Sequence, residues 1–318
     1  MSSTDTTGDA GPSSAETSCV GELSLTKWTH ATPTFRALNH RFAVRSTHGG
    51  IGRFVEEMCK SFCVADQGPF TWYSIVHGLP GDAPHALYVN EDRMVHGPDA
   101  SDVVSYLIWH INRQAIRSSH DRVLLHAAAA SLEGFGVLLP GAMESGKTTL
   151  VAGLTMSGFQ YLTDEAAAID PETLSLHPYP KPLSVDPGSW TVLADLAPRL
   201  DGSTAAYFDK QWQVPPTAIY PEAVSGPVQA TVVVFPNYER GADTDVAPMP
   251  KSEALLVMLE QTFQFHAAGP RNLEVLARLL EDVTCYRMIS GDLDEACQAV
   301  THLVHACRPV PTSGTDSR

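Results

Sequence analysis

The sequence predicts an α/β fold in which a phosphate-binding loop joins a buried strand to a helix, with a smaller α+β region before it. Residues 141–148 fit the pattern G-x-x-x-x-G-K-[ST] at every fixed position. The apolar run 135–139 before the loop suits a buried strand, and residues 148–157 after it place apolar side chains on one helical face before a glycine. Strand, loop and helix are the context that this motif requires, so the pattern is specific here.

The loop residues have the chemistry of a polyphosphate cradle. Glycines let the backbone wrap an anion with its N–H groups pointing inward, and the following helix adds unpaired N–H groups and a positive dipole end. We expect Lys147 to reach the β- and γ-phosphates and Thr148 to ligate Mg²⁺. The alternative, a glycine turn with a surface lysine, is disfavoured by the flanking elements. The predicted nucleotide contacts are Gly141, Ala142, Met143, Glu144, Ser145, Gly146, Lys147, Thr148 and Thr149.

Length and charge exclude some classes of protein. The chain has 318 residues and a formal charge of −15, which argues against a general nucleic-acid or anionic-membrane surface because both need clustered Lys and Arg. No apolar run of about 18 residues and no secretory signal are found. Cys59 and Cys63 could share a helical face, but core packing is favoured over a metal site. A reduced, cytoplasmic protein is expected, and a homo-oligomer stays open.

The region before the loop shows mixed patterning. Residues 1–18 and 309–318 cannot form a core and are predicted to be disordered tails. Between them we expect a small α+β domain at 19–118 and the loop-containing domain at 119–308. The expected elements of the first domain are strands at 35–44, 72–76 and 86–89 and helices at 51–62 and 99–118. The last helix is the clearest, because its apolar residues follow one stripe.

Residues 122–132 and the strand before the loop predict a hairpin that closes at Glu133-Gly134. His126 then lies on a strand next to the loop. A lone histidine on an apolar strand is usually a core group, and spacing alone favours that interpretation.

Two carboxylates, Asp164 and Glu165, end the next expected strand, at 159–165. Carboxylates at the end of a strand beside a phosphate loop are well placed to hold Mg²⁺ or to accept a proton from an attacking hydroxyl. Two adjacent carboxylates on a solvated turn are common in proteins that have no site there. The neighbouring phosphate loop is the reason to favour a functional role for this pair.

The rest of the chain supplies scaffold. We expect a short helix at 187–196, a loop-rich region at 200–224, a central strand at 229–235, and helices at 252–265, 272–281 and 293–307. Cations that could clamp a γ-phosphate are few: Lys181, Arg240 and Arg271 lie on predicted loops or a helix start. The sequence favours a solvated surface charge for each of them.

The order His126, glycine turn, strand, phosphate loop, helix and acidic pair resembles the catalytic domain of HPr kinase/phosphorylase and its HPr-kinase-like relatives. The resemblance covers about residues 122–306 and is strongest over the first forty. It implies a P-loop kinase fold, also similar to ATP-dependent phosphoenolpyruvate carboxykinase. The region before it looks like that of the HPr-kinase-related proteins.

The resemblance also implies roles for individual residues. Lys147 and Thr148 become phosphate and metal contacts, Asp164 the general base for a serine hydroxyl, and His126 a group near the phosphates. Glu165 stands where the family has a second aspartate, so a metal role survives chemically. No match to the family's segment linked to phosphorolysis is found, so the reverse reaction is not part of what the resemblance implies here.

We therefore expect an ATP- and Mg²⁺-dependent kinase acting on a hydroxyl acceptor, a serine of a protein or peptide or a small metabolite. The alternative is an ATP-binding regulatory or scaffold protein without transferase activity. A guanine-specific switch is disfavoured because N-K-x-D is absent from the sequence, and an adenylate-kinase type because no arginine-rich lid follows the loop.

Overall fold

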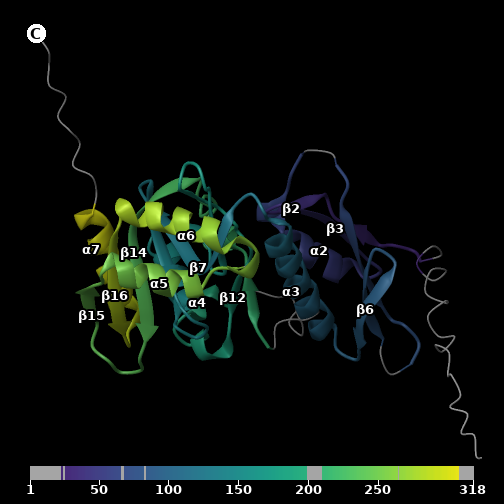
Figure 1. Cartoon of the computed structure of the whole chain (residues 1–318). Helices are drawn as coiled ribbons and strands as arrows, with labels where there is room; N and C mark the ends of the chain where they lie inside the picture. The colour runs from purple at the N-terminus through teal and green to yellow at the C-terminus, as the bar shows by residue number, and fades with distance from the viewer. Residues whose placement is uncertain are drawn as a thin grey trace, which may run out of the picture.

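The computed structural model describes residues 23, 26–65, 68–81, 84–198, 210–263 and 265–307. The predicted tails at 1–18 and 309–318 lie outside these residues. Figure 1 shows the chain as two bodies side by side, a smaller one from the first third of the chain and a larger one from the remainder. None of the described helices combines the length and the apolar character needed to cross a membrane.

The smaller body is a sheet with two helices. Within the described residues its sheet has six strands in the order β1-β3-β4-β5-β6, with β2 paired to β3. The strands are β1 His30–Ala31, β2 Phe35–Ala37, β3 His40–Ser46, β4 Thr71–His77, β5 His85–Val89 and β6 Asp92–Gly97, and the helices are α2 Gly49–Met58 and α3 Ala100–Ser118, with a 3-10 turn η1 at Lys60–Phe62.

Both helices form because their apolar residues recur at helical spacing. In α3, Val103, Leu107 and Ile111 are buried, at intervals that place them on one face. Asp102 lies in the first turn of α3 and Arg117 in the last. A negative charge near the N-terminus and a positive charge near the C-terminus both interact favourably with the helix dipole. The predicted helix at 99–118 is therefore confirmed.

Two predictions for the smaller body need correction. The single strand expected at 35–44 is a hairpin, because Leu38 adopts a left-handed φ of 51° and turns the chain between β2 and β3. The helix expected at 51–62 ends at Met58. Cys59 is buried as predicted, whereas Cys63 is exposed, because it follows the 3-10 turn and has left the helical face.

The larger body is built on a second sheet. Within the described residues this sheet has eight strands in the order β11-β10-β7-β8-β14-β16-β15, with β9 paired to β7. The strands are β7 Val123–Leu132, β8 Phe135–Pro140, β9 Gln160–Thr163, β10 Ala166–Ile169, β11 Ser175–His177, β14 Val228–Tyr238, β15 Asp245–Pro248 and β16 Thr284–Ser290. The helices are α4 Lys147–Met156, α5 Lys251–Glu260, α6 Phe265–Glu281 and α7 Leu293–Ala306. A separate strand pair is formed by β12 Leu183–Val185 and β13 Trp212–Val214. The 3-10 turns are η2 Pro187–Ser189, η3 Ala194–Leu196 and η5 Pro216–Ala218.

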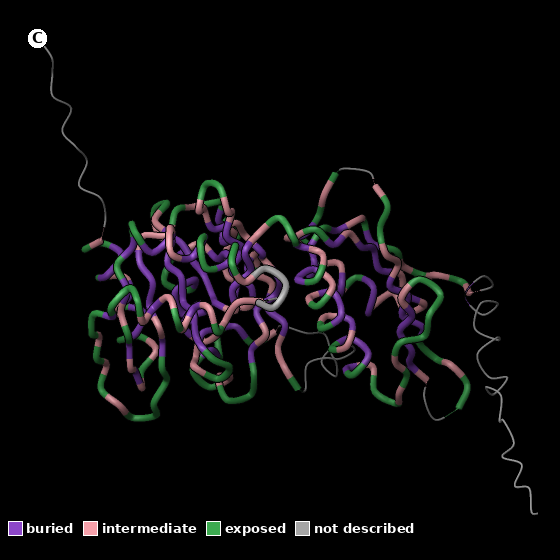
Figure 2. The backbone as a smooth tube through the Cα atoms, viewed as in Figure 1, coloured by how far each residue is buried: buried purple, intermediate pink, exposed green. Residues whose placement is uncertain are grey.

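Strand alternation divides the larger core into two layers. Val232 and Val234 of β14 pack with residues of α4 and α7, while Val233 packs with residues of α5 and α6. This follows from the two-residue period of a strand. Because helices cover both faces, the middle residues of the central strands are buried, as the tube in Figure 2 shows.

The elements around the loop match the predicted order. The β7–β8 hairpin closes at Glu133 and Gly134, both with positive φ (54° and 85°), as a tight hairpin turn requires. The predicted central strand is β14. It lies parallel to β8 on one side and to β16 on the other, so the carboxyl ends of these three strands meet at one edge of the sheet.

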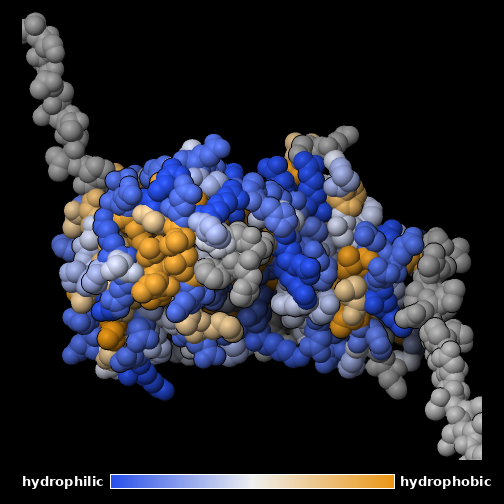
Figure 3. Space-filling view, viewed as in Figure 1, coloured by the Kyte–Doolittle hydropathy of each residue, from blue (hydrophilic) through white to orange (hydrophobic). Residues whose placement is uncertain are grey.

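Other predictions for the larger body differ from the structure. Strands β15 and β16 were not foreseen, and the helix expected at 187–196 is two 3-10 turns, interrupted where Trp190 and Trp212 stack at 5.0 Å. The helix expected at 252–265 ends at Glu260, and α6 begins at Phe265 rather than at 272. Figure 3 shows an apolar area over α5 and α6, the helices that carry the exposed Leu256 and Leu273.

The two bodies share part of their cores. The hydrophobic cluster of the smaller body includes Leu124, Ala166 and Tyr179 of the larger one. The Tyr179 ring stacks on Phe62 at 5.7 Å, and its hydroxyl donates to Asn112 Oδ1 at 2.8 Å. The division into domains between residues 118 and 119 stays a prediction. Through Tyr179, the smaller body contacts the segment that leads to Lys181.

Candidate phosphate-binding site

The loop between β8 and α4 has the backbone that its glycines predict. Gly146, at the N-cap of α4, has φ 90°, and Glu144 has φ 64°. A Cβ on Gly146 would lie 3.1 Å from Cβ of Tyr238, and one on Gly141 would lie 2.6 Å from Ser145 Oγ. Both positions therefore require glycine, Gly146 also because of its left-handed φ.

Lys147 lies over the loop that precedes it. Its ammonium group donates to the carbonyl oxygens of Gly141 (2.8 Å) and Ala142 (2.6 Å), and the residue is 6% exposed. Burial lowers the pKa of Lys147, while the carboxylates of Glu165 and Asp164 act in the opposite direction. A buried cation at a helix N-terminus is strongly attracted to an anion, because little water screens it.

The remaining loop residues divide into a tip and a base. Ala142, Met143 and Glu144 form an exposed tip, with Met143 81% exposed. At the base, Thr148 is half-buried, and Thr149 Oγ1 lies 2.6 Å from Ser189 Oγ in η2. These contacts place the Thr149 side chain toward η2.

Ser145 supplies a polar atom that the described structure does not use. Its Oγ is buried and has no hydrogen-bond partner there, a situation that normally costs about 1–3 kcal/mol. A polyphosphate oxygen is an acceptor of the kind that this hydroxyl lacks. The glycine cradle, the Lys147 ammonium and the helix N-terminus fit the same ligand.

Asp164 is a buried carboxylate with three donors. Its Oδ1 accepts from the Tyr161 hydroxyl (2.8 Å) and pairs with Lys181 Nζ (2.8 Å), and its Oδ2 accepts from the Ser184 backbone N–H (3.1 Å). The side chains of Asp164 and Lys181 are 1% and 5% exposed. A proton acceptor must be open to its substrate, so one of these donors has to move before Asp164 can take that role.

Glu165 is the more accessible carboxylate of the pair. It is half-buried, and its charge acts on the pKa of both Lys147 and His126 more strongly than that of Asp164. Within the described residues no three His, Cys, Asp or Glu side chains form a group that could hold a metal ion.

His126 lies half-buried beside this group. Its Nδ1 is 3.3 Å from Gln261 Oε1, and its backbone N–H donates to the Gln261 carbonyl at 2.8 Å. Burial, and then the charge of Lys147, lower its pKa below the ordinary 6.5, so the ring is neutral at pH 7. The structure thus brings Lys147, Asp164, Glu165 and His126 into one electrostatic group.

The three clamp candidates occupy different environments. Lys181 is held by Asp164, and Arg271 donates to the carbonyls of His120 (2.8 Å) and Asp121 (3.2 Å). Arg240 is exposed in the turn after β14. The partners Tyr161 and Gln261 were missed by sequence reasoning, because no motif marks them and both reach the site only through strand pairing and a helix end.

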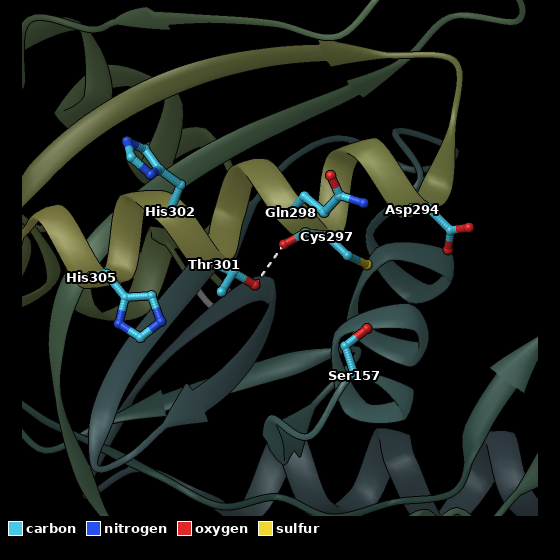
Figure 4. Close-up of a pocket in the computed structure, with 7 residues that line it drawn as sticks. All are labelled: Ser157, Asp294, Cys297, Gln298, Thr301, His302 and His305. Atoms are coloured by element: carbon cyan, nitrogen blue, oxygen red, sulfur yellow. Dashed lines mark hydrogen bonds between the residues drawn. The ribbon is translucent and has the colours of Figure 1, made fainter.

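A separate hollow lies along α7, as Figure 4 shows. It measures about 380 Å³ and is lined by Ser157, Asp294, Cys297, Gln298, Thr301, His302 and His305. Ser157 follows the end of α4 opposite the loop, and ten helical residues span about 15 Å. Figure 4 shows His302 and His305 on different sides of α7. The hollow is therefore remote from the phosphate loop.

Comparisons with known proteins found matches among solved structures. No family model matches the sequence, and no curated protein matches it significantly. Among solved structures, the chain is similar in fold to the HPr(Ser) kinase/phosphatase from Coxiella burnetii, with 13% sequence identity and a TM-score of 0.30, over 57% of this chain and 94% of that one.

Proposed function

We propose that this protein binds ATP with Mg²⁺ at the loop 141–148 and transfers the γ-phosphate to a hydroxyl group. The observation that carries the proposal is the buried Lys147 ammonium, which lies over a glycine cradle and within electrostatic reach of two carboxylates. Phosphoryl transfer depends mainly on positioning and charge neutralisation. The described site has the groups for both.

The binding residues follow from the cradle. Lys147 and the first N–H groups of α4 hold the phosphates, and the Ser145 hydroxyl has a free bond to donate. Thr148 and Glu165 offer hard oxygen donors of the kind that Mg²⁺ prefers. When bound, the ion would neutralise charge on the phosphate oxygens. The His126 ring is neutral at pH 7, so it can donate or accept a hydrogen bond near the phosphates without adding charge.

Asp164 is our candidate for the group that accepts the proton of the acceptor hydroxyl. The structure adds a condition, since three donors hold its carboxylate in the described conformation. Lys181 is the donor that an incoming polyphosphate can attract, because it is the one charged donor among the three. Movement of Lys181 would expose Asp164 as the substrate arrives.

The acceptor is proposed to be a serine of a protein or peptide, or a small hydroxyl metabolite. This part of the proposal rests on the resemblance of the sequence to the HPr kinase family. Action in the cytoplasm is part of the same proposal.

A second candidate, an ATP-binding regulatory or scaffold protein, is favoured by one observation. The Asp164 side chain is 1% exposed and paired, as expected of a carboxylate that stabilises the fold. Both candidates bind nucleotide, and they differ in transfer.

The test combines binding with transfer. Lys147→Ala should abolish ATP binding measured by calorimetry with Mg²⁺ present, while Lys60→Ala, at a lysine 64% exposed in the smaller body, should bind as the wild type does. Unchanged affinity in a folded Lys147→Ala variant would overturn the site. Tight ATP binding without transfer from labelled ATP to any protein, peptide or hydroxyl acceptor would favour the second candidate.

A further inference from the structure

Tyr238 is an exposed aromatic residue at the rim of the phosphate loop. Tyr238 is the last residue of β14 and is 56% exposed. No hydrogen bond joins its hydroxyl to the described residues. Three aromatic side chains are exposed among the described residues. Phe70 and Trp109 belong to the smaller body, and Tyr238 belongs to the larger one. Ligand sites are commonly lined by aromatic side chains, and this ring lies beside the candidate ligand loop.

The contacts of Tyr238 place it against the loop itself. Its backbone N–H donates to the Ser145 carbonyl at 3.3 Å, and its Cβ would lie 3.1 Å from a Cβ on Gly146. Because β14 and β8 are parallel neighbours, Tyr238 and the loop share the carboxyl edge of the sheet. Ligands of open α/β sheets bind at this edge.

The segment after Tyr238 is held firmly. The Glu239 N–H donates to the Ser290 carbonyl (3.1 Å), and the Gly291 N–H donates to the Ala242 carbonyl (3.1 Å). A Cβ on Gly291 would lie 2.7 Å from three backbone atoms of this turn. The ring therefore stands on a preorganised support, which reduces the entropy lost when a ligand binds.

The two flanks of the loop differ in chemistry. On the β7 side lie Asp164, Glu165 and His126, where the proposed transfer takes place; on the β14 side lies Tyr238. A polyphosphate whose γ end faces the carboxylates must direct its nucleoside away from them. The flank that remains is the one with the aromatic ring, where the next two residues, Glu239 and Arg240, are also exposed.

We propose that Tyr238 is the platform on which the nucleobase of the bound nucleotide stacks. The inference rests on the proposed nucleotide site and adds the residue that contacts the base. Stacking uses the π-face, which every base presents, so it gives affinity for the nucleoside with little preference between adenine and guanine. Met143 at the exposed loop tip offers a second apolar surface.

The experiment compares ATP with inorganic tripolyphosphate, which has the phosphates but no base. Calorimetric titrations of the full chain would use the wild type, Tyr238→Ala, Tyr238→Phe and the exposed-aromatic control Trp109→Ala. Tyr238→Ala should weaken ATP and GTP binding about 5- to 150-fold, the value of one base–aromatic stack, and leave tripolyphosphate binding unchanged. Tyr238→Phe and Trp109→Ala should bind ATP as the wild type does.

Each other outcome is decisive. Equal loss of ATP and tripolyphosphate in a folded Tyr238→Ala variant would mean that Tyr238 supports phosphate binding and not the base. ATP affinity unaffected by Tyr238→Ala would mean that the ring takes no part. Either result overturns the stacking role and leaves the nucleotide site standing. A wild type that binds neither ligand would instead overturn the nucleotide site. Circular dichroism of each variant establishes that it is folded.

Discussion

Replacing Lys181 with methionine tests whether the buried ion pair holds the acidic edge of the site. The Lys181 ammonium pairs with Asp164 at 2.8 Å, and the two side chains are 5% and 1% exposed. It also donates to the Pro182 carbonyl and the Ser184 hydroxyl, both at 3.1 Å. Methionine keeps most of the volume and removes the charge and all three contacts.

The magnitude follows from the group left behind. Removing one partner of a buried pair typically costs about 3–5 kcal/mol, because an uncompensated charge remains. Asp164 would keep the Tyr161 hydroxyl and the Ser184 N–H as donors, so we expect a loss near the lower end, about 3 kcal/mol. Adding Asp164→Asn removes the stranded charge and should restore part of that loss.

Urea unfolding followed by tryptophan fluorescence measures this loss. The matched control is Lys60→Met, because the Lys60–Glu57 pair is 64% and 67% exposed and an exposed pair contributes at most about 1 kcal/mol. If Lys181→Met lost no more stability than Lys60→Met, or if the double variant were less stable than Lys181→Met, the pair would not support the site as argued.

The other predictions concern the two carboxylates and a buried histidine. Asp164→Asn should retain ATP binding and lower transfer about 10²–10⁴-fold, whereas Glu165→Gln should raise the Mg²⁺ concentration required; full transfer by Asp164→Asn would refute its assigned role. Burial, and then the charge of His110, lower the pKa of His40 from 6.5 to about 4. Between these two pH values His40 is protonated in the unfolded chain and neutral in the folded chain. Stability should therefore fall by about 3 kcal/mol as pH drops from 6.5 to about 4, and urea unfolding should show a smaller fall in His40→Gln.

The phosphate loop could be predicted because its information is local. The positions of Gly141, Gly146 and Lys147 are fixed by the backbone that an anion cradle needs, and the flanking strand and helix by the periodicity of adjacent residues. The same applies to α3 and α7, whose apolar stripes lie within one element. Neighbouring residues suffice wherever hydrogen bonds join residues close in sequence.

Elements that depend on distant partners were missed or misjudged. Strand β16 has no strong alternation, and it forms because β14 and β15 pair with it on either side. The helix expected at 187–196 yields to a chain path set by the packing of Trp190 on Trp212. In these segments tertiary contacts outweigh weak local preference.

The sequence by itself determined that a glycine-rich loop follows a buried strand and that two carboxylates follow the next strand. The fold decided what surrounds those groups: Lys181 and Tyr161 close around Asp164 while Glu165 stays accessible, and the register of β14 against β8 places Tyr238 beside Gly146. The reason is physical, since burial and charge pairing depend on which strands become neighbours, and residues far apart in the chain meet only when the sheet forms.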